Sequence, residues 1–217
     1  MKHQNNMKYS NGLFLKIISL SVFLLVINIQ SQTVLKINAP FTVIGIVNLA
    51  VEKPFGKNIS LQAEGFISPW KSFHGKNLQI YMGTLEGRYY FNEIMKKWYV
   101  GTYGSIAAFD LQKWNYLTKQ PVLDDVGNSQ YLDDGSIRTA EMYQRGVAFV
   151  FGISGGYHFT VSENLGLDVF AGIGSVQSFY KGYIKENNER YDKAKNWNKS
   201  GEIIPTRAGL MITYILP

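Results

Sequence analysis

The sequence contains no cysteine, and among its 217 residues it has only six prolines and three histidines. The absence of cysteine excludes disulfide bonds, zinc sites with thiolate ligands and a lipid-anchored N-terminal cysteine. The formal net charge is +6, but the chain has neither an arginine-rich helix nor a long basic block. We therefore expect no nucleic-acid partner.

Beyond its N-terminal segment, the chain lacks any apolar run of the roughly 20 residues that a membrane-spanning helix needs. In that segment, lysines precede an apolar stretch at residues 13–27, and the small Ser31 offers a cleavage position. This layout is typical of a secretory signal; the alternative is an uncleaved anchor. We predict that residues 1–31 are a signal peptide and that residues 32–217 form one exported domain.

The exported part is rich in residues that favour strands and tight turns. The sequence has 13 phenylalanines, 14 tyrosines and 21 glycines, and many of its segments alternate between apolar and polar residues. This alternation predicts eight strands, at about residues 33–40, 43–53, 59–68, 77–91, 98–110, 145–159, 165–179 and 203–216.

The connections between these strands alternate in length. Three are short, with the sequences PFGKN, NEIMKK and VSENLG, and three are longer: SPWKSFHGK, residues 111–144 and residues 180–202. Only the short first connection, at residues 40–42, breaks the rhythm. Outer-membrane barrels have tight periplasmic turns at one rim and long loops at the other. The sequence thus predicts an all-β fold, an eight-stranded antiparallel up-and-down transmembrane β-barrel.

The predicted strands have one apolar and one mixed face. Apolar residues share a face at positions 59, 61, 63 and 67, at 167, 169, 171 and 173, and at 208, 210, 212, 214 and 216. A charge facing lipid costs about 2–4 kcal/mol for Arg or Lys, so the charged face must be the interior if there is a membrane. We expect Glu64 to pair there with Arg88. The interior charges are Glu64, Glu86, Arg88, Asp168 and Arg207, and aromatic residues gather at strand ends in RYYF, KKWYV and FYKGY.

Residues 152–156 read GISGG and match the G-x-S-x-G pattern of serine-hydrolase nucleophile elbows. An elbow requires a strand, a sharp turn and a helix, whereas this segment alternates with period two from end to end. We interpret Ser154 as a small interior residue of a strand. His158 lies four residues away, about 13 Å along a strand, which is too far for it to act as the base.

Other candidate sites are equally weak. His158 with Thr160 or Ser162 suggests a lipid-modifying hydrolase or acyltransferase, but no orienting acid or oxyanion donor can be named. His74 has no second histidine at ligand spacing. The loop aspartates lack the spacing of a calcium-binding EF-hand; they are Asp124, Asp125, Asp133 and Asp134. We therefore predict no catalytic, cofactor-binding or metal-binding residue, no cofactor and no enzymatic activity.

Three stretches carry a resemblance to a known family: VEKPFGKNISLQAEGFISPW, LEGRYYFNEIMKKWYVGTYG and IPTRAGLMITYIL. Their most recognisable parts are Pro69-Trp70, Glu86-x-Arg88-Tyr89 and the segment 205–209. They resemble domain of unknown function 3575, an uncharacterised group of small outer-membrane barrels. The resemblance covers nearly all of the exported chain and implies location and fold but no site. The chain departs from outer-membrane barrels in ending Tyr-Ile-Leu-Pro, because such barrels usually end on an aromatic residue.

Together these features predict a structural or surface-interaction protein in the outer membrane of a diderm bacterium, reached after cleavage of the signal peptide. An eight-stranded barrel is just wide enough for its own side chains, so a general pore is not expected. The expected partners are the lipid bilayer, the barrel assembly machinery and an extracellular partner contacting residues 111–144 and 180–202. The alternatives are a membrane-embedded lipid-modifying enzyme and a soluble periplasmic barrel that binds an apolar ligand.

Overall fold

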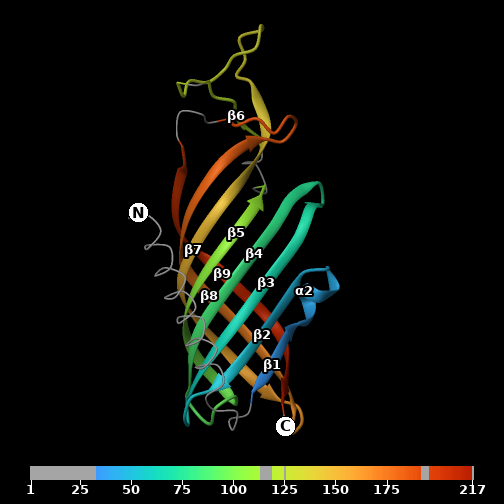
Figure 1. Ribbon diagram of the computed structural model, residues 1–217, viewed down its shortest axis with the longest axis vertical. Helices are drawn as coiled ribbons and strands as arrows, with labels where there is room; N and C mark the ends of the chain where they lie inside the picture. The colour runs from blue at the N-terminus through green and yellow to red at the C-terminus, as the bar shows by residue number, and fades with distance from the viewer. Residues whose placement is uncertain (1–32, 113–118, 125, 192–195, 217) are drawn as a thin grey trace, which may run out of the picture. The chain divides into compact units, whose positions relative to one another are not determined.

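The structure is a computed structural model, and it describes residues 33–112, 119–124, 126–191 and 196–216. Eight antiparallel strands in these residues form one closed ring, in the order β5-β4-β3-β2-β1-β9-β8-β7, with β5 pairing to β7 (Figure 1). The predicted all-β, eight-stranded up-and-down barrel is thus confirmed. The strands are β1 (Val34–Asn38), β2 (Val47–Pro54), β3 (Ile59–Phe73), β4 (Lys76–Tyr90), β5 (Lys97–Leu111), β7 (Thr139–Thr160), β8 (Leu165–Ile184) and β9 (Asn198–Ile215).

Two further elements lie in the connections. The short strand β6 (Lys119–Pro121) pairs with the part of β7 that extends beyond the ring. The helix α2 (Ala39–Val43) joins β1 to β2. Among the described residues, no helix is long and apolar enough to cross a membrane.

Consecutive antiparallel strands place their connections at alternate ends of the barrel. The turns 55–58, 91–96 and 161–164 lie at one end, here named the short-turn rim. The other end, here named the long-loop rim, carries α2, the β3–β4 turn and the connections 112–138 and 185–197. The three predicted short turns therefore share one rim, whereas of the three predicted longer connections only two, residues 111–144 and 180–202, are long.

Several predicted boundaries are wrong. Residues 39–43 form α2 where two strand ends and a short connection at residues 40–42 were expected; Pro40 is tolerated in the first turn of a helix because an N–H there has no partner within the helix. The predicted loop SPWKSFHGK is mostly strand, since β3 and β4 are joined by a two-residue turn at His74 and Gly75, both with positive φ. β7, β8 and β9 also extend farther into the long connections than the alternation indicated.

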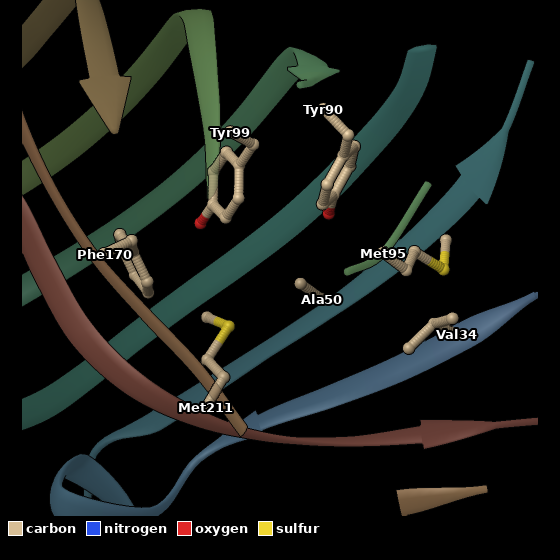
Figure 2. Packing of buried hydrophobic residues seen from close by; sticks show 7 residues of the cluster. All are labelled: Val34, Ala50, Tyr90, Met95, Tyr99, Phe170 and Met211. Carbon is tan, nitrogen blue, oxygen red and sulfur yellow. The ribbon is translucent and has the colours of Figure 1, made fainter. Parts of the chain in front are cut away.

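The two faces of the barrel differ as the alternation predicted. On β3, Ile59, Leu61 and Ile67 are exposed, whereas Gln62 and Glu64 are buried. The interior near the short-turn rim also holds an apolar cluster, shown in Figure 2 and made of Val34, Ala50, Tyr90, Met95, Tyr99, Phe170 and Met211. Met95 comes from the turn 91–96, so this turn inserts a side chain into the end of the barrel.

Candidate functional site

Seven ionisable side chains from six strands meet inside the barrel, and we refer to them as the charge cluster: Lys36, Glu52, Glu64, Glu86, Arg88, Asp168 and Arg207. Each lies on the inward side of its strand and has at least one apolar neighbour or glycine on the outer face. An ion buried in this way is costly unless it is paired and hydrogen-bonded. Every member of the cluster has at least one ion-pair partner.

Arg88 on β4 lies at the centre of the cluster. One terminal nitrogen of its guanidinium is 2.7 Å from Asp168 and 3.2 Å from Glu52, and the other is 2.9 Å from Glu86. Lys36 on β1 contacts two of the same carboxylates. Its Nζ donates to Asp168 on β8 at 2.6 Å and also contacts Glu52 on β2. Four strands are thereby tied together through one guanidinium and one ammonium group.

Arg207 on β9 forms a second layer, nearer the middle of the barrel. Its guanidinium binds Glu64 and lies 3.0 Å from Glu86. It also stacks on two aromatic rings, 4.9 Å from the centroid of Tyr103 and 5.0 Å from that of Phe170. Such cation–π contacts add to the ion pairs where water is excluded.

The predicted pair of Glu64 with Arg88 is wrong. Glu64 lies opposite Thr84, and Arg88 lies opposite Ser60. The two charges are thus offset by four residues along the strands, about 13 Å, which is too far for an ion pair. Alternation fixed the face on which each charge lies, but the pairing depends on the register and on strands across the barrel.

The sequence analysis missed Lys36, Glu52 and Tyr99, although alternation places each of them on the inward face of its strand. Lys36 lies between Leu35 and Ile37, and Glu52 follows Val51, so each stands on the polar side of its strand. The hydroxyl of Tyr99 donates to Asp168 at 2.7 Å. Its inward position is also set by alternation, but an aromatic residue gave no sign of a polar role.

The GISGG segment is explained by its neighbour β5. Gly152 and Gly156 lie directly opposite Tyr103 and Tyr99, and a Cβ atom at either glycine would clash with the tyrosine ring. The two glycines thus make room for the large rings inside the barrel. Ser154, between them, is buried and donates its hydroxyl hydrogen to Glu86.

The remaining candidate residues do not assemble into a catalytic site. His158 is buried, and its Nε2 lies 3.0 Å from the hydroxyl of Thr213, whereas Ser154 contacts a carboxylate. Thr160 and Ser162 are exposed near the short-turn rim. His158 is thus not the hydrogen-bond partner of Ser154, and the carboxylate that is, Glu86, is itself paired with Arg88 and Arg207.

His74 occupies the β3–β4 turn with φ of 48° and packs against the ring of Phe73. Asp124 accepts hydrogen bonds from the backbone N–H groups of Asn128 and Val126, at 2.8 and 2.9 Å, and chiefly the first of these lowers the pKa of its carboxyl group.

Asp134 accepts hydrogen bonds from the backbone N–H and the hydroxyl of Ser136, and the hydroxyl is the main cause that lowers the pKa of the Asp134 carboxyl group. Asp133 is exposed, and Asp125 lies outside the described residues. Across the described part of the chain, no group of three or more His, Asp or Glu side chains is arranged to hold a metal ion. Asp124 and Asp134 thus stabilise turns in their own loop.

The charge cluster suits a structural role better than a chemical one. Each carboxylate is held by cations or hydroxyl donors, and each cation faces at least two acceptors. The cluster therefore locks strands that are distant in sequence.

Comparison with known proteins gives one match. The family model described as "protein of unknown function (DUF3575)" matches residues 15–216. No curated protein and no solved structure matches the chain.

Proposed function

We propose that this chain, which belongs to the DUF3575 family of proteins of unknown function, is a small outer-membrane β-barrel. The barrel would anchor surface-interaction loops to the membrane. The family carries no activity to transfer. The proposal is therefore built on the chemistry of the two faces of the barrel and on its rims.

The observation that carries the proposal is the inversion of the two faces. The barrel interior holds the seven members of the charge cluster, while the outside presents large apolar residues on every strand of the ring, such as Leu85 (59% exposed), Ile106 (63%) and Ile153 (63%). Monomeric soluble proteins rarely expose contiguous apolar surface of this extent. An apolar band around a polar interior is what a membrane barrel requires.

The aromatic residues support the same orientation in lipid. Near the short-turn rim, Trp98 packs edge-on against Tyr157 with ring centroids 5.0 Å apart, and Tyr89 does so against Phe91 at 5.7 Å. These rings are exposed or partly exposed at the strand ends. Rings with one apolar and one wet side favour the bilayer interface.

The interior favours an anchor over a general pore. The charge cluster and the buried side chains of Tyr90, Met95 and Tyr99 fill the barrel at the short-turn rim. An eight-stranded barrel is only wide enough for its own side chains. Solute diffusion is therefore not the expected function.

The long-loop rim is the part available to an extracellular partner. β7 and β8 extend beyond the ring, and the connection that includes residues 119–138 exposes apolar side chains, among them Val126 and Tyr131. We propose that the segments 111–144 and 180–202 make the contact with a partner. We also propose that residues 1–31 direct export and that the chain is not an enzyme, which the contacts of Ser154 and His158 support.

The experiment is fractionation of cells followed by gel electrophoresis without heating. We expect the protein in the outer-membrane fraction, and we expect the unheated sample to migrate differently from the heated one because the closed barrel survives detergent. Release as a soluble protein without detergent would contradict the proposal and favour the soluble barrel. Altered lipid A in a deletion strain would favour the lipid-modifying enzyme instead.

A further inference from the structure

The wall of the barrel is incomplete in the half next to the long-loop rim. The pairing of β1 with β9 ends at Asn38 opposite Met211, and the pairing of β2 with β3 begins at Val47 opposite Ile67. β3 and β9 continue past these points without β1 and β2 between them, and Figure 1 shows the β3–β4 hairpin rising past α2. Where two strands are missing, their neighbours lie three strand spacings apart, about 14 Å.

α2 fills part of this gap, which we name the side opening. Phe41 of α2 packs edge-on against the inward-facing Phe66, with ring centroids 5.4 Å apart. The turn after α2 is fixed from the other side, because the indole N–H of Trp70 donates to the carbonyl oxygen of Ile44 at 3.0 Å. The helix and the turn that follows it therefore lie at the side opening in contact with β3.

Both strands that border the side opening carry a proline there, Pro69 on β3 and Pro205 on β9. A proline cannot donate a backbone hydrogen bond, so it is accepted in a strand only at an edge or a bulge. The pairing of β9 with β8 also shifts register between Gly172 and Ile173, next to this proline. The proline in each strand is therefore compatible with an unpaired strand edge at the side opening.

Behind the side opening lies a cavity with a mainly apolar lining, which we name the cup. One part, of about 420 Å³, is lined by Phe41, Phe66, Ile80, Met82 and Pro205, and also by Asn48, Glu64 and Arg207. A second part, of about 280 Å³, extends toward the long-loop rim; its lining includes Ala107, Phe109, Ala148, Val150 and Val176, and also the polar residues Gln144, Ser178, Ser200 and Glu202. The two parts share Ile80, Pro205 and Thr206, so they adjoin. Their size is near the roughly 300–1,000 Å³ of ordinary ligand sites.

The floor of the cup is the layer of Arg207, Tyr103 and Thr206. Arg207 is already paired with Glu64 and Glu86, and the charge cluster to which it belongs contains three cations and four carboxylates, a formal charge of −1. An anionic group in the cup would meet this surplus of negative charge in a poorly hydrated space. The floor therefore selects against a carboxylate or a phosphate.

We propose that the cup binds one hydrocarbon chain of a monoacyl lipid with an uncharged head, which enters from the bilayer between β3 and β9 beside α2. The apolar part of the lining matches a hydrocarbon chain, the carboxylate of Glu202 adds to the negative charge that disfavours an anionic head, and the side opening lies level with outward-facing residues such as Val47 and Ile67. The inference rests on the proposed membrane function, because only a bilayer delivers lipid to the side of a barrel.

Titration calorimetry tests the proposal on the full mature protein, held in an amphipathic polymer in place of detergent. Monolauroylglycerol is the uncharged probe and laurate the anionic one. We expect saturable binding of one monolauroylglycerol per barrel, and binding of laurate weaker by about tenfold because its charge approaches the floor.

Ala107 and Ala108 provide matched variants, because the first faces the cup and the second faces outward on the same strand. Ala107→Trp should weaken monolauroylglycerol binding by about tenfold or more, because it fills the cavity, while Ala108→Trp should change it by less than about twofold. If Ala107→Trp does not assemble, Ala148→Leu occupies the same space from β7.

The failure of this inference and that of the proposed function give different results. The protein could show heat-modifiable migration but no saturable binding, or equal binding by wild type and Ala107→Trp. Either result overturns the proposed hydrocarbon-chain site in the cup and leaves the membrane function standing. Laurate binding as tight as monolauroylglycerol binding overturns the choice of an uncharged ligand. A protein that stays soluble without the polymer overturns the membrane function, and the lateral route with it.

Discussion

Arg88 contacts carboxylates from β2, β4 and β8, all of them buried. Arg88→Ala leaves Glu52, Glu86 and Asp168 crowded together with less positive charge, and breaking a buried ion pair costs about 3–5 kcal/mol. We expect a loss of free energy of unfolding of that size, measured by urea unfolding in detergent micelles.

The matched control for Arg88→Ala is Lys96→Ala. Lys96 pairs with Glu93 in the turn 91–96, and both side chains are more than half exposed. A surface pair contributes little, so this variant should unfold almost as wild type does. Equal losses of free energy of unfolding in the two variants would mean that Arg88 faces water. That is the arrangement of a soluble barrel, in which the polar face is the outer one.

The glycines of GISGG give a second prediction at the residue scale. A Cβ atom at Gly156 would lie 2.7 Å from the carbonyl oxygen of Val169 and closer still to the hydroxyl of Tyr99, whereas the nearest atom to a Cβ at Gly155 is 3.8 Å away. Gly156→Ala should therefore destabilise the barrel by about 1–3 kcal/mol, as overpacking does. Gly155→Ala should leave the melting temperature nearly unchanged, and a comparable fall in both would contradict the inward position of Gly156.

Ser154 provides a test of the non-enzymatic interpretation. Its hydroxyl contacts Glu86 inside the barrel, so serine-directed fluorophosphonates should leave the folded protein unlabelled. Ser154→Ala should assemble and leave lipid A unchanged. Stoichiometric labelling that disappears in Ser154→Ala would make the enzyme the leading hypothesis.

The sequence was informative about which residues lie inside and uninformative about which of them touch. Period-two alternation placed Glu86, Asp168 and Arg207 in the interior correctly, because a strand has only two faces. It paired Glu64 with Arg88 wrongly. Contacts across a barrel depend on the register of several strands together, and no local pattern encodes that.

At the scale of elements, the long-loop rim should face the outside of the cell. Epitope tags near Gly127 and Asn188 should be reached by antibody on intact cells, because both lie in connections of that rim. A tag near Asn92, in the turn 91–96, should be reached only after the outer membrane is opened. Labelling of the Asn92 tag alone on intact cells would reverse the orientation.

The elements that the sequence misplaced are those where the ring is irregular. α2 and the β3–β4 hairpin both border the side opening, where strands have a partner on one side only. Pro69 is unfavourable in the middle of a sheet, whereas an edge strand accepts it because no second neighbour needs an N–H group there. The irregularity is visible only once the pairing of β1, β2 and β9 is known.

At the scale of the whole molecule, the barrel is inverted, with ions inside and apolar residues outside. The interior ions hold the strands together, and the outer residues have no partner within the described chain other than their neighbours on the same face. Burial of that outer surface in lipid would supply the favourable free energy that a soluble protein obtains from its core. Membrane embedding is therefore the central claim.

The measurement that tests this claim most directly is cysteine labelling on intact cells with a water-soluble maleimide, which the absence of native cysteine makes specific. The side chain of Ile153 is 63% exposed on the outer face of β7, and Asn188 lies in a connection of the long-loop rim. The account predicts that Asn188→Cys is labelled, and that Ile153→Cys stays unlabelled until the protein is unfolded outside the membrane. Labelling of Ile153→Cys in the folded protein as fast as that of Asn188→Cys would show that water, and not lipid, covers the outer face.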